Sequence, residues 1–178
     1  IMGEEKSKRK FKLSKKVKKL ICLFIVLVFS FLIATQWISV LYIKSFSMSP
    51  TLESGQIMIL LKKKEVKQGD VVAFWKNDKL FVKRAIAKQG QYVDIDIKGK
   101  VSVDHKVIKE DYVDHLSLGN SNISMPHQVD QSHWFCLGDN RDSSIDSRNT
   151  IIGDVSENQI EGVVVFRIWP LNKFRIIQ

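Results

Sequence analysis

The chain has 178 residues, 44% hydrophobic and 26% charged, so it is too apolar to be disordered and long enough for one domain with an appendage. Its net charge of +9 would suit a nucleic-acid binder if it were spread evenly. However, residues 1–19 hold nine Lys or Arg against two Glu, and residues 44–178 hold 19 against 17, a net of +2. The nearly neutral larger part argues against a nucleic-acid partner.

The segment between these parts, residues 20–43, carries no charged residue. As one helix its 24 residues would span about 36 Å, more than the roughly 30 Å hydrocarbon core of a bilayer. The run is longer than the apolar region of a signal peptide, and its exit, VLYIKSFS, has no small-x-small site. We therefore predict a transmembrane anchor over residues 20–43. A cleaved signal peptide and a buried core helix are the alternatives.

The position of the basic residues predicts the orientation of this anchor. Basic residues beside a membrane segment usually stay on the cytoplasmic side. Residues 1–19 are therefore expected to form a cytoplasmic tail that also binds anionic lipid headgroups, and residues 44–178 to lie outside the cytoplasm. Trp37 and Tyr42 are then expected near the outer interface, where amphipathic rings are favoured.

The cysteines and histidines predict neither a disulfide nor a metal site. Cys22 falls in the predicted anchor and Cys136 far along the outer part, so we expect no pairing. The four histidines form no HExxH motif and have no CxxC partner set. We expect the protein to need no metal and no cofactor.

Residues 44–178 contain short runs of β-branched and aromatic residues, separated by turn-forming clusters and without a sustained 3.6-residue period. We predict a mostly β domain in which antiparallel sheets form a folded, barrel-like unit. Residues 109–132 show no regular apolar pattern, which predicts a long surface excursion. The predicted strands are Ile57–Leu61, Val71–Trp75, Leu80–Ala87, Tyr92–Ile97, Val101–Val103, His133–Leu137 and Gly162–Ile168, with turns at residues 69–70, 76–78 and 98–99.

A candidate nucleophile follows the predicted anchor. Residues 45–52 read SFSMSPTL, and taken alone this tract is typical of a solvated turn. A serine hydroxyl needs a base before it attacks. No histidine lies near an obvious partner acid, so a neutral lysine has to be considered as the base.

A candidate base lies in the predicted strand LFVKRAI, residues 80–86. Alternate side chains of a strand share a face, and both faces here are largely apolar. Whichever of Lys83 and Arg84 faces inward is desolvated, which lowers the pKa of a lysine, whereas arginine stays protonated. A pair of basic residues that protects an edge strand from aggregation is the alternative.

A third segment, Gly138 to Arg148, packs three acids, two arginines and three serines into eleven residues, GDNRDSSIDSR. Acids and bases at this spacing form internal networks that fix the shape of a loop, and a rigid loop positions catalytic groups. A solvated charged loop is the alternative.

These segments together resemble the bacterial type I signal peptidases, membrane-bound serine endopeptidases that remove signal peptides from exported preproteins. The motif order of that family is a Ser-Met-x-Pro-Thr-Leu box, a Gly-Asp-Val-Val strand entry, a Lys-Arg strand and a Gly-Asp-Asn-Arg-Asp-x-Ser-x-Asp-Ser-Arg loop. All four occur in order, at Ser47–Leu52, Gly69–Val72, Lys83-Arg84 and Gly138–Arg148. The resemblance extends to Phe166–Leu171. It implies that residues 44–178 form an extracytoplasmic catalytic domain and that the protein resides in a bacterial cell membrane.

The resemblance implies roles for individual residues. Ser47 would be the nucleophile and Lys83 the general base of an acyl-enzyme mechanism. Ser144 would orient the lysine amine by a hydrogen bond, and Asp146 and Arg148 would support the loop.

It also implies how substrate is bound. Ser45 resembles the side-chain donor of the oxyanion hole, acting with the backbone N–H of Ser47. The substrate would be an extended peptide that adds as a strand, with small residues one and three positions before the cut. Met48 is expected to touch lipid or the pockets for these small residues. The chain departs from the family at Ala87–Gln91, which reads AKQGQ where such enzymes have Gly-x-Pro-Gly-Asp.

Two other classes remain open. A self-cleaving repressor with a Ser/Lys pair resembles the same fold, but it is cytoplasmic and carries a DNA-binding helix-turn-helix where this chain has its predicted span. An anchored module without activity, whose tail binds anionic lipid, would explain residues 1–19 but has no use for a Ser47 and Lys83 pair. If the pair is catalytic, activity should rise with pH through a depressed pKa of Lys83.

Overall fold

The computed structural model describes residues 14–62 and 64–177, which divide into a first unit that ends at Gln36 and a second that begins at Trp37. Helix α1, Lys15–Trp37, makes up nearly all of the described part of the first unit, and its last residue, Trp37, belongs to the second; no residue of the helix is buried. Most of the predicted basic tail, residues 1–13, lies outside the described residues.

Helix α1 has 23 residues, about 35 Å at 1.5 Å per residue. Within the described residues it is the one helix long and apolar enough to cross a membrane, a test that a signal sequence also passes. The predicted helical run over residues 20–43 is wrong in its bounds, because the helix begins at Lys15 and ends at Trp37. The next five residues pair along their whole length with Ile57–Leu61, and this pairing satisfies their backbone groups as a strand.

The second unit is rich in strands, as predicted. All seven predicted strands are confirmed, three with the predicted bounds and four with ends that differ by one or two residues. The five that were not predicted are short, and four of these have two residues, too few for a periodic pattern. The elements are β1 (Ile38–Tyr42), β2 (Ile57–Leu61), β3 (Val71–Lys76), β4 (Lys79–Lys88), β5 (Tyr92–Ile95), β6 (Val101–Val103), β7 (Lys106–Val107), β8 (His127–Gln128), β9 (His133–Leu137), β10 (Val155–Ser156), η1 (Glu157–Gln159), β11 (Ile160–Trp169), η2 (Leu171–Lys173) and β12 (Arg175–Ile176).

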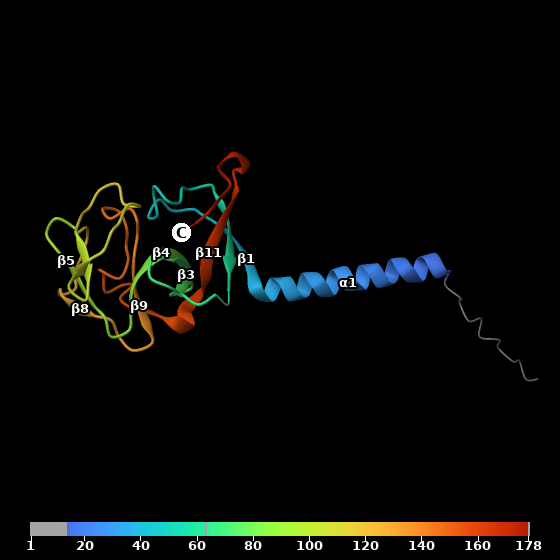
Figure 1. The fold of residues 1–178 in the computed structure, drawn as a ribbon, viewed down its shortest axis with the longest axis horizontal. Helices are drawn as coiled ribbons and strands as arrows, with labels where there is room; N and C mark the ends of the chain where they lie inside the picture. The colour runs from blue at the N-terminus through green and yellow to red at the C-terminus, as the bar shows by residue number, and fades with distance from the viewer. Residues whose placement is uncertain (1–13, 63, 178) are drawn as a thin grey trace, which may run out of the picture. The chain divides into compact units, whose positions relative to one another are not determined.

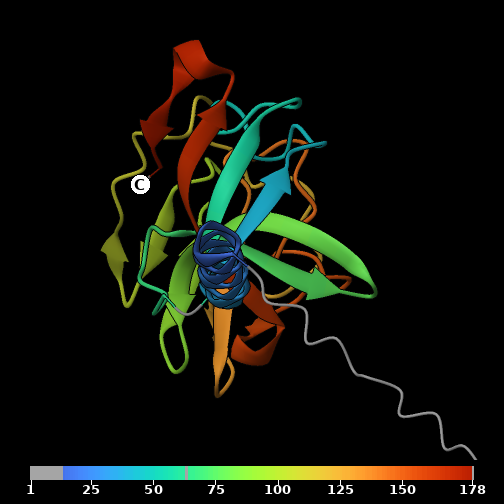
Figure 2. The same cartoon turned by 90° about the vertical axis from the view of Figure 1, so that its right-hand side faces the viewer.

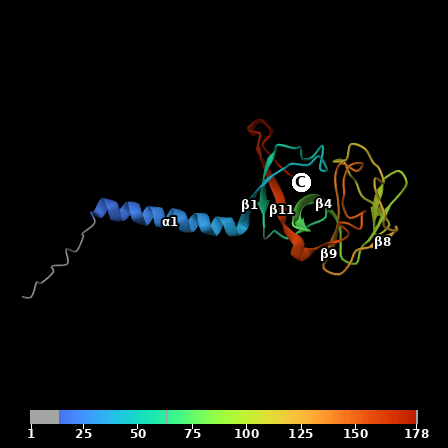
Figure 3. The same ribbon diagram turned by 180° about the vertical axis from the view of Figure 1, so that it is seen from behind.

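These strands form two antiparallel sheets. The larger has the order β1-β2-β11-β3-β4-β9-β10, with β12 paired to β11, and the smaller has the order β7-β6-β5-β8. Figures 1 and 3 show the smaller sheet and β1 at opposite ends of this unit, with β9 between them. The predicted antiparallel sheets are confirmed. The barrel-like closure is not, because β1 and β10, the two ends of the larger sheet, do not pair in the described part of the chain.

Residues 109–132 are mostly irregular, as predicted, but they are not a free surface loop. Strand β8, near the end of this excursion, pairs with β5. Val129 is buried, and Leu118 and Ile123 pack against the apolar cluster formed by β4, β9 and the smaller sheet. The apolar residues of the excursion are irregularly spaced, so no periodic pattern predicted their burial.

The nucleophile segment, residues 45–52 around the predicted nucleophile, is fixed by the core of the larger sheet. Met48 and Leu52 are 2% and 0% exposed and pack with Met58 and Leu60 of β2. Burying each such side chain contributes roughly 1.5–3 kcal/mol. Strand β11 lies between β2 and β3, and Figure 2 shows it continuing into the hairpin with β12. The backbone beside Met48, including Ser47, is therefore fixed by packing.

Candidate active site

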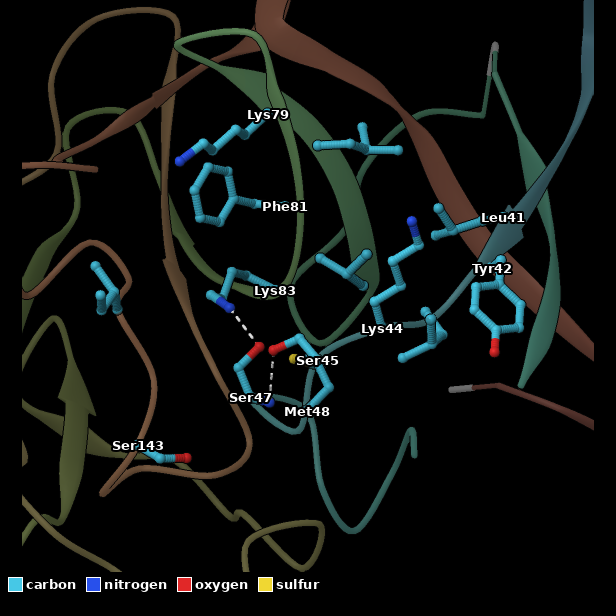
Figure 4. A pocket seen from close by; sticks show the side chains of 14 residues that line it. Leu41, Tyr42, Lys44, Ser45, Ser47, Met48, Lys79, Phe81, Lys83 and Ser143 are labelled. Atoms are coloured by element: carbon cyan, nitrogen blue, oxygen red, sulfur yellow. Dashed lines mark hydrogen bonds between the residues drawn. The ribbon is translucent and has the colours of Figure 1, made fainter. Parts of the chain in front are cut away.

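A cavity of about 680 Å³ in the second unit holds both predicted catalytic residues. Its walls are the end of β1 with the nucleophile segment, the first half of β4, and the loop after β9 (Figure 4). The described lining is largely apolar and includes three lysines and three serines but no acidic residue. The residues are Leu41, Tyr42, Ile43, Lys44, Ser45, Ser47, Met48, Lys79, Leu80, Phe81, Val82, Lys83, Ser143 and Ile145.

The structure brings Ser47 and Lys83 into direct contact. The Nζ of Lys83 lies 2.6 Å from the Oγ of Ser47, and Figure 4 shows this hydrogen bond inside the cavity. Lys83 is 2% exposed and points into the cavity, while the next residue, Arg84, forms its contacts away from the cavity. This is the alternation that a strand imposes.

The surroundings of Lys83 favour the neutral amine. Burial lowers the pKa of Lys83 to about 8, and the charges of Asp146 and Asp139 oppose this shift. Within the described residues, no carboxylate forms an ion pair with the amine. About half of Lys83 is therefore unprotonated at pH 8, and the unprotonated amine is the form that can accept a proton.

The predicted oxyanion donors lie beside the nucleophile but bind each other. The hydroxyl oxygen of Ser45 accepts a hydrogen bond of 3.1 Å from the backbone N–H of Ser47 (Figure 4). The hydroxyl proton of Ser45 remains available for a substrate oxygen.

Ser144 lies close to Ser47, but the hydrogen bond predicted between Ser144 and Lys83 is not present. Ser144 is 3% exposed, and among the described residues its Oγ has no hydrogen-bond partner. A Cβ on Gly138 would lie 2.1 Å from this Oγ and 2.6 Å from the carbonyl oxygen of Ser47. Glycine at position 138 is therefore what allows the loop to approach the nucleophile so closely.

Asp146 and Arg148 form a fully buried ion pair. The Nε and Nη2 of Arg148 donate to the two carboxylate oxygens of Asp146, both at 2.9 Å. Asp146 also accepts the backbone N–H of Gly138 at 2.9 Å. The pair closes residues 138–148 into a rigid loop, because it joins the first residue of the segment to the last.

Arg84 and Asp139 form a second buried ion pair, which was not predicted from the sequence. Arg84 donates from Nε and Nη2 to Asp139 at 2.9 and 2.6 Å, and both side chains are 1% exposed. The hydroxyl of Thr51 donates to the same carboxylate at 2.5 Å. This carboxylate links the nucleophile segment, the strand of Lys83 and the loop. The sequence offers no local signal for it, because Thr51 and Asp139 are 88 residues apart.

The loop also contacts the nucleophile through its backbone. The N–H of Asn140 donates to the carbonyl oxygen of Ser47 at 3.1 Å, and the N–H of Ser144 donates to the carbonyl oxygen of Asn140 at 3.1 Å. The position of the loop and the position of Ser47 are therefore coupled.

No metal-binding cluster accompanies this site. Across residues 14–62 and 64–177, no group of three or more His, Cys, Asp or Glu residues is arranged to hold a metal ion. His127 instead contacts Asp154, with Nε2 2.9 Å from Oδ1.

A serine hydroxyl beside a desolvated amine, in an open and largely apolar cavity, defines the class of serine hydrolases that use a lysine base. A family model described as "Signal peptidase, peptidase S26" matches residues 16–169. The chain belongs to this signal peptidase family, so the family predicted from the motifs is confirmed.

Known relatives agree with this assignment. The chain is similar to signal peptidase I of Bacillus caldolyticus, with 35% identity over 72% of this chain and 78% of the relative. It is similar to signal peptidase IB of Staphylococcus aureus, with 33% identity over 75% of this chain and 78% of the relative. Thylakoidal processing peptidase 1 of Arabidopsis thaliana is 33% identical over 74% of this chain, which spans only 42% of that relative.

Proposed function

We propose that this chain is a membrane-anchored type I signal peptidase that removes N-terminal signal peptides from exported preproteins. The observation that supports the reaction is the 2.6 Å contact between Ser47 and a buried lysine whose pKa is lowered to about 8. Membership of the signal peptidase family supports the substrate class. A lipid-binding module has no use for this pair, and a self-cleaving repressor would carry a DNA-binding helix-turn-helix where this chain has the apolar helix α1.

In the first half of the reaction, the neutral amine of Lys83 accepts the hydroxyl proton of Ser47 while Oγ attacks the scissile carbonyl carbon. The Lys83 ammonium then gives this proton to the departing amine, and the carbon–nitrogen bond breaks. The signal peptide remains on Ser47 as an ester, and the mature protein leaves with a new amino terminus.

In the second half, Lys83 is neutral again and takes a proton from water as the water oxygen attacks the ester. The bond to Ser47 breaks, Ser47 recovers a proton from Lys83, and the signal peptide leaves with a new carboxylate. Ser144 is our candidate for orienting the amine in both halves, because its hydroxyl is buried without a hydrogen-bond partner in the described part of the chain and lies on a loop that touches Ser47. Asp146 and Arg148 would support that loop.

The negative charge on the substrate oxygen needs donors during both halves. We assign this role to the hydroxyl of Ser45 and the backbone N–H of Ser47, which lie 3.1 Å apart beside the nucleophile. Donors aimed at developing charge stabilise the transition state more than the ground state. Their hydrogen bond to each other implies that the Ser45 side chain rotates when substrate enters.

One edge of β4 suits an extended peptide. Residues 79–84 of β4 pair with β3 on one side, whereas pairing with β9 on the other side begins at Arg84. Among the described strands, the edge of residues 79–83 that faces the cavity has no partner. A signal peptide can add there as a strand and place its small residues against Met48 and Phe81, which line the cavity.

Helix α1 would anchor the enzyme once across the bacterial cell membrane, with the basic N-terminal residues on the cytoplasmic side and in contact with anionic lipid. The catalytic unit would then lie outside the cytoplasm. Ser47 follows the end of α1 by ten residues. Tethering enzyme and preprotein to the same membrane limits the search for the cleavage site, which favours the reaction entropically.

The direct test is cleavage of a model preprotein by the detergent-solubilised full chain, compared with Ser47→Ala and Lys83→Met at equal concentration. The expected result is one cut after a small-x-small site by the parent, and background cleavage by both variants. Equal cleavage by all three proteins would disprove the proposed roles, as would a folded parent that does not cut.

A further inference from the structure

Two residues of the excursion, Glu110 and Tyr112, contact the arginines around the active site. Glu110 forms a bidentate ion pair with Arg141, whose side chain is 1% exposed against 4% for Glu110. The ring of Tyr112 stacks on the guanidinium of Arg84 at 3.8 Å from its centroid, and its hydroxyl donates to Glu110 at 3.0 Å. Burial raises the pKa of Tyr112, with a further contribution from Glu110, so the phenol keeps this proton. None of the catalytic motifs includes residues 110–112.

Glu110 is connected to Ser47 through Arg141. The Nε of Arg141 donates to the carbonyl oxygen of Gly138 at 3.1 Å, and the intervening part of the loop binds the carbonyl oxygen of Ser47 through Asn140. If Glu110 is neutralised, Arg141 keeps its buried charge without its carboxylate, which is strongly unfavourable. Arg141 must then move or admit water, and the loop that contacts Ser47 moves with it.

Tyr112 is connected to Lys83 through Arg84, the next residue of the strand. Arg84 binds Asp139 and also donates from Nη1 to the carbonyl oxygen of Gly69 at 2.7 Å. The Tyr112 ring covers the guanidinium and adds a cation–π attraction. Without this ring, water reaches the charged guanidinium of Arg84. Arg84 is adjacent to Lys83, the proposed base, whose neutral form depends on burial.

We propose that Glu110 and Tyr112 are positioning residues of the peptidase, which hold Arg141 and Arg84 and thereby keep Ser47 and Lys83 at reacting distance. This proposal rests on the proposed function of that pair. It assigns to these two residues of the excursion a supporting role in catalysis, although neither touches the reacting atoms.

The excursion provides its own control for a purely structural role. Ile123 packs against the apolar cluster of β4, β9 and the smaller sheet, and no described contact joins it to Arg84 or Arg141. Truncating Ile123 therefore loosens the same segment without disturbing the two arginines. The kcat of the Glu110 and Tyr112 variants can then be compared with that of an Ile123 variant whose melting temperature is lowered by the same amount.

The experiment uses the full chain in detergent and compares Glu110→Gln, Tyr112→Leu, Tyr112→Phe and Ile123→Ala. For each variant, kcat, KM, the pH dependence of kcat/KM and the melting temperature are measured with a model preprotein. A second readout needs no turnover: the ¹³C resonance of the Lys83 ε-carbon is titrated in a Ser47→Ala background. That resonance is assigned by its loss in Lys83→Met.

Glu110→Gln and Tyr112→Leu are expected to lower kcat about 10- to 100-fold with KM changed less than about threefold, since small displacements of reacting groups carry costs of this size. The Lys83 midpoint should move upward from about 8 as water enters. Tyr112→Phe, which keeps the ring, should retain kcat within about threefold, as should Ile123→Ala.

The proposal is overturned if Glu110→Gln and Tyr112→Leu melt earlier but keep the parental kcat and Lys83 midpoint, as Ile123→Ala should. A rise in KM alone would also overturn it, because the excursion would then act on substrate binding. A parent that cleaves nothing while its Lys83 midpoint still shifts in Glu110→Gln would support positioning and reject the proposed function.

Discussion

Strand β4 places two neighbouring cations in surroundings that treat their charge differently. Lys83 is 2% exposed, and its amine contacts the hydroxyl of Ser47 in a cavity whose described lining includes no acid. Arg84 is 1% exposed, and its guanidinium binds the carboxylate of Asp139 at two atoms and stacks on Tyr112. Burial is nearly equal at the two positions.

What differs is the partner. A buried cation with a hydroxyl partner loses part of its preference for the charged form, so it becomes a usable base. A buried cation with a bidentate carboxylate keeps its charge and becomes a fixed structural link. One strand can therefore supply a reactive group and its support at adjacent residues, because alternation sends the two side chains to different faces.

The largest effect on cleavage is expected when Lys83 is replaced by arginine, the residue type of its neighbour Arg84. Lys83→Arg retains a long cation but removes the group that can lose its proton, so cleavage should fall at least about a thousandfold. The measurement is kcat/KM for a model preprotein at pH 9, with the melting temperature as a check of folding. Activity within about tenfold of the parent would show that position 83 does not act as the base.

The two positions should differ in their effect on stability. Asp139→Ala leaves the charge of Arg84 buried without its carboxylate, and the free energy of unfolding should fall by about 3–5 kcal/mol. Lys83→Met leaves no buried charge without its counterion and conserves the shape of the side chain. The free energy of unfolding should therefore change by less than about 1.5 kcal/mol. Urea denaturation followed by tryptophan fluorescence measures both. Equal losses would mean that the two cations are held in the same way.

The rate of cleavage should depend on pH through Lys83. The pKa of Lys83 is lowered to about 8, and only the unprotonated amine accepts the Ser47 proton. Below this value kcat/KM should fall by about tenfold per pH unit as the amine is protonated, and above it the rate should level off. A profile of kcat/KM between pH 6 and pH 9.5 tests this, and a flat profile contradicts it.

The smallest effect is expected at an exposed ion pair in the excursion. Lys109 and Asp111 approach to 2.5 Å, but their side chains are 83% and 72% exposed. Water and salt screen such pairs, so Lys109→Ala should leave melting temperature and cleavage unchanged within error. Thermal unfolding at low salt is the most sensitive check. A clear loss of stability would assign this pair to the network of Glu110 and Tyr112.

Local sequence patterns predicted most of the longer strands in the second unit. The seven predicted strands follow from β-branched and aromatic runs bounded by turn residues, and Asn77 and Asp78 adopt the positive φ angles of a tight hairpin between β3 and β4. The extent of α1 could not be predicted, because an uncharged run suits a helix and a strand equally. Pairing with β2 decides that Ile38–Tyr42 is a strand.

The sequence predicted several residues of the candidate site and missed others. Ser47, Lys83, Asp146 and Arg148 were singled out through the motifs shared with the family, whereas the composition of residues 138–148 predicted only that this loop holds an internal network. Glu110 was not found, because its partner Arg141 lies 31 residues away and the segment around it has no pattern.

The sequence by itself determined where the chain is charged and uncharged, which runs alternate as strands, and which residue types were available for catalysis, because these follow from composition and from the two-residue period of a strand. Only the tertiary structure decided which of these residues meet. The register of the sheets brings Lys83 to Ser47 across 36 positions and Asp139 to Thr51 across 88. Burial and the partner that each group meets then decide its charge, since both depend on what surrounds a side chain in space and not on its neighbours along the chain.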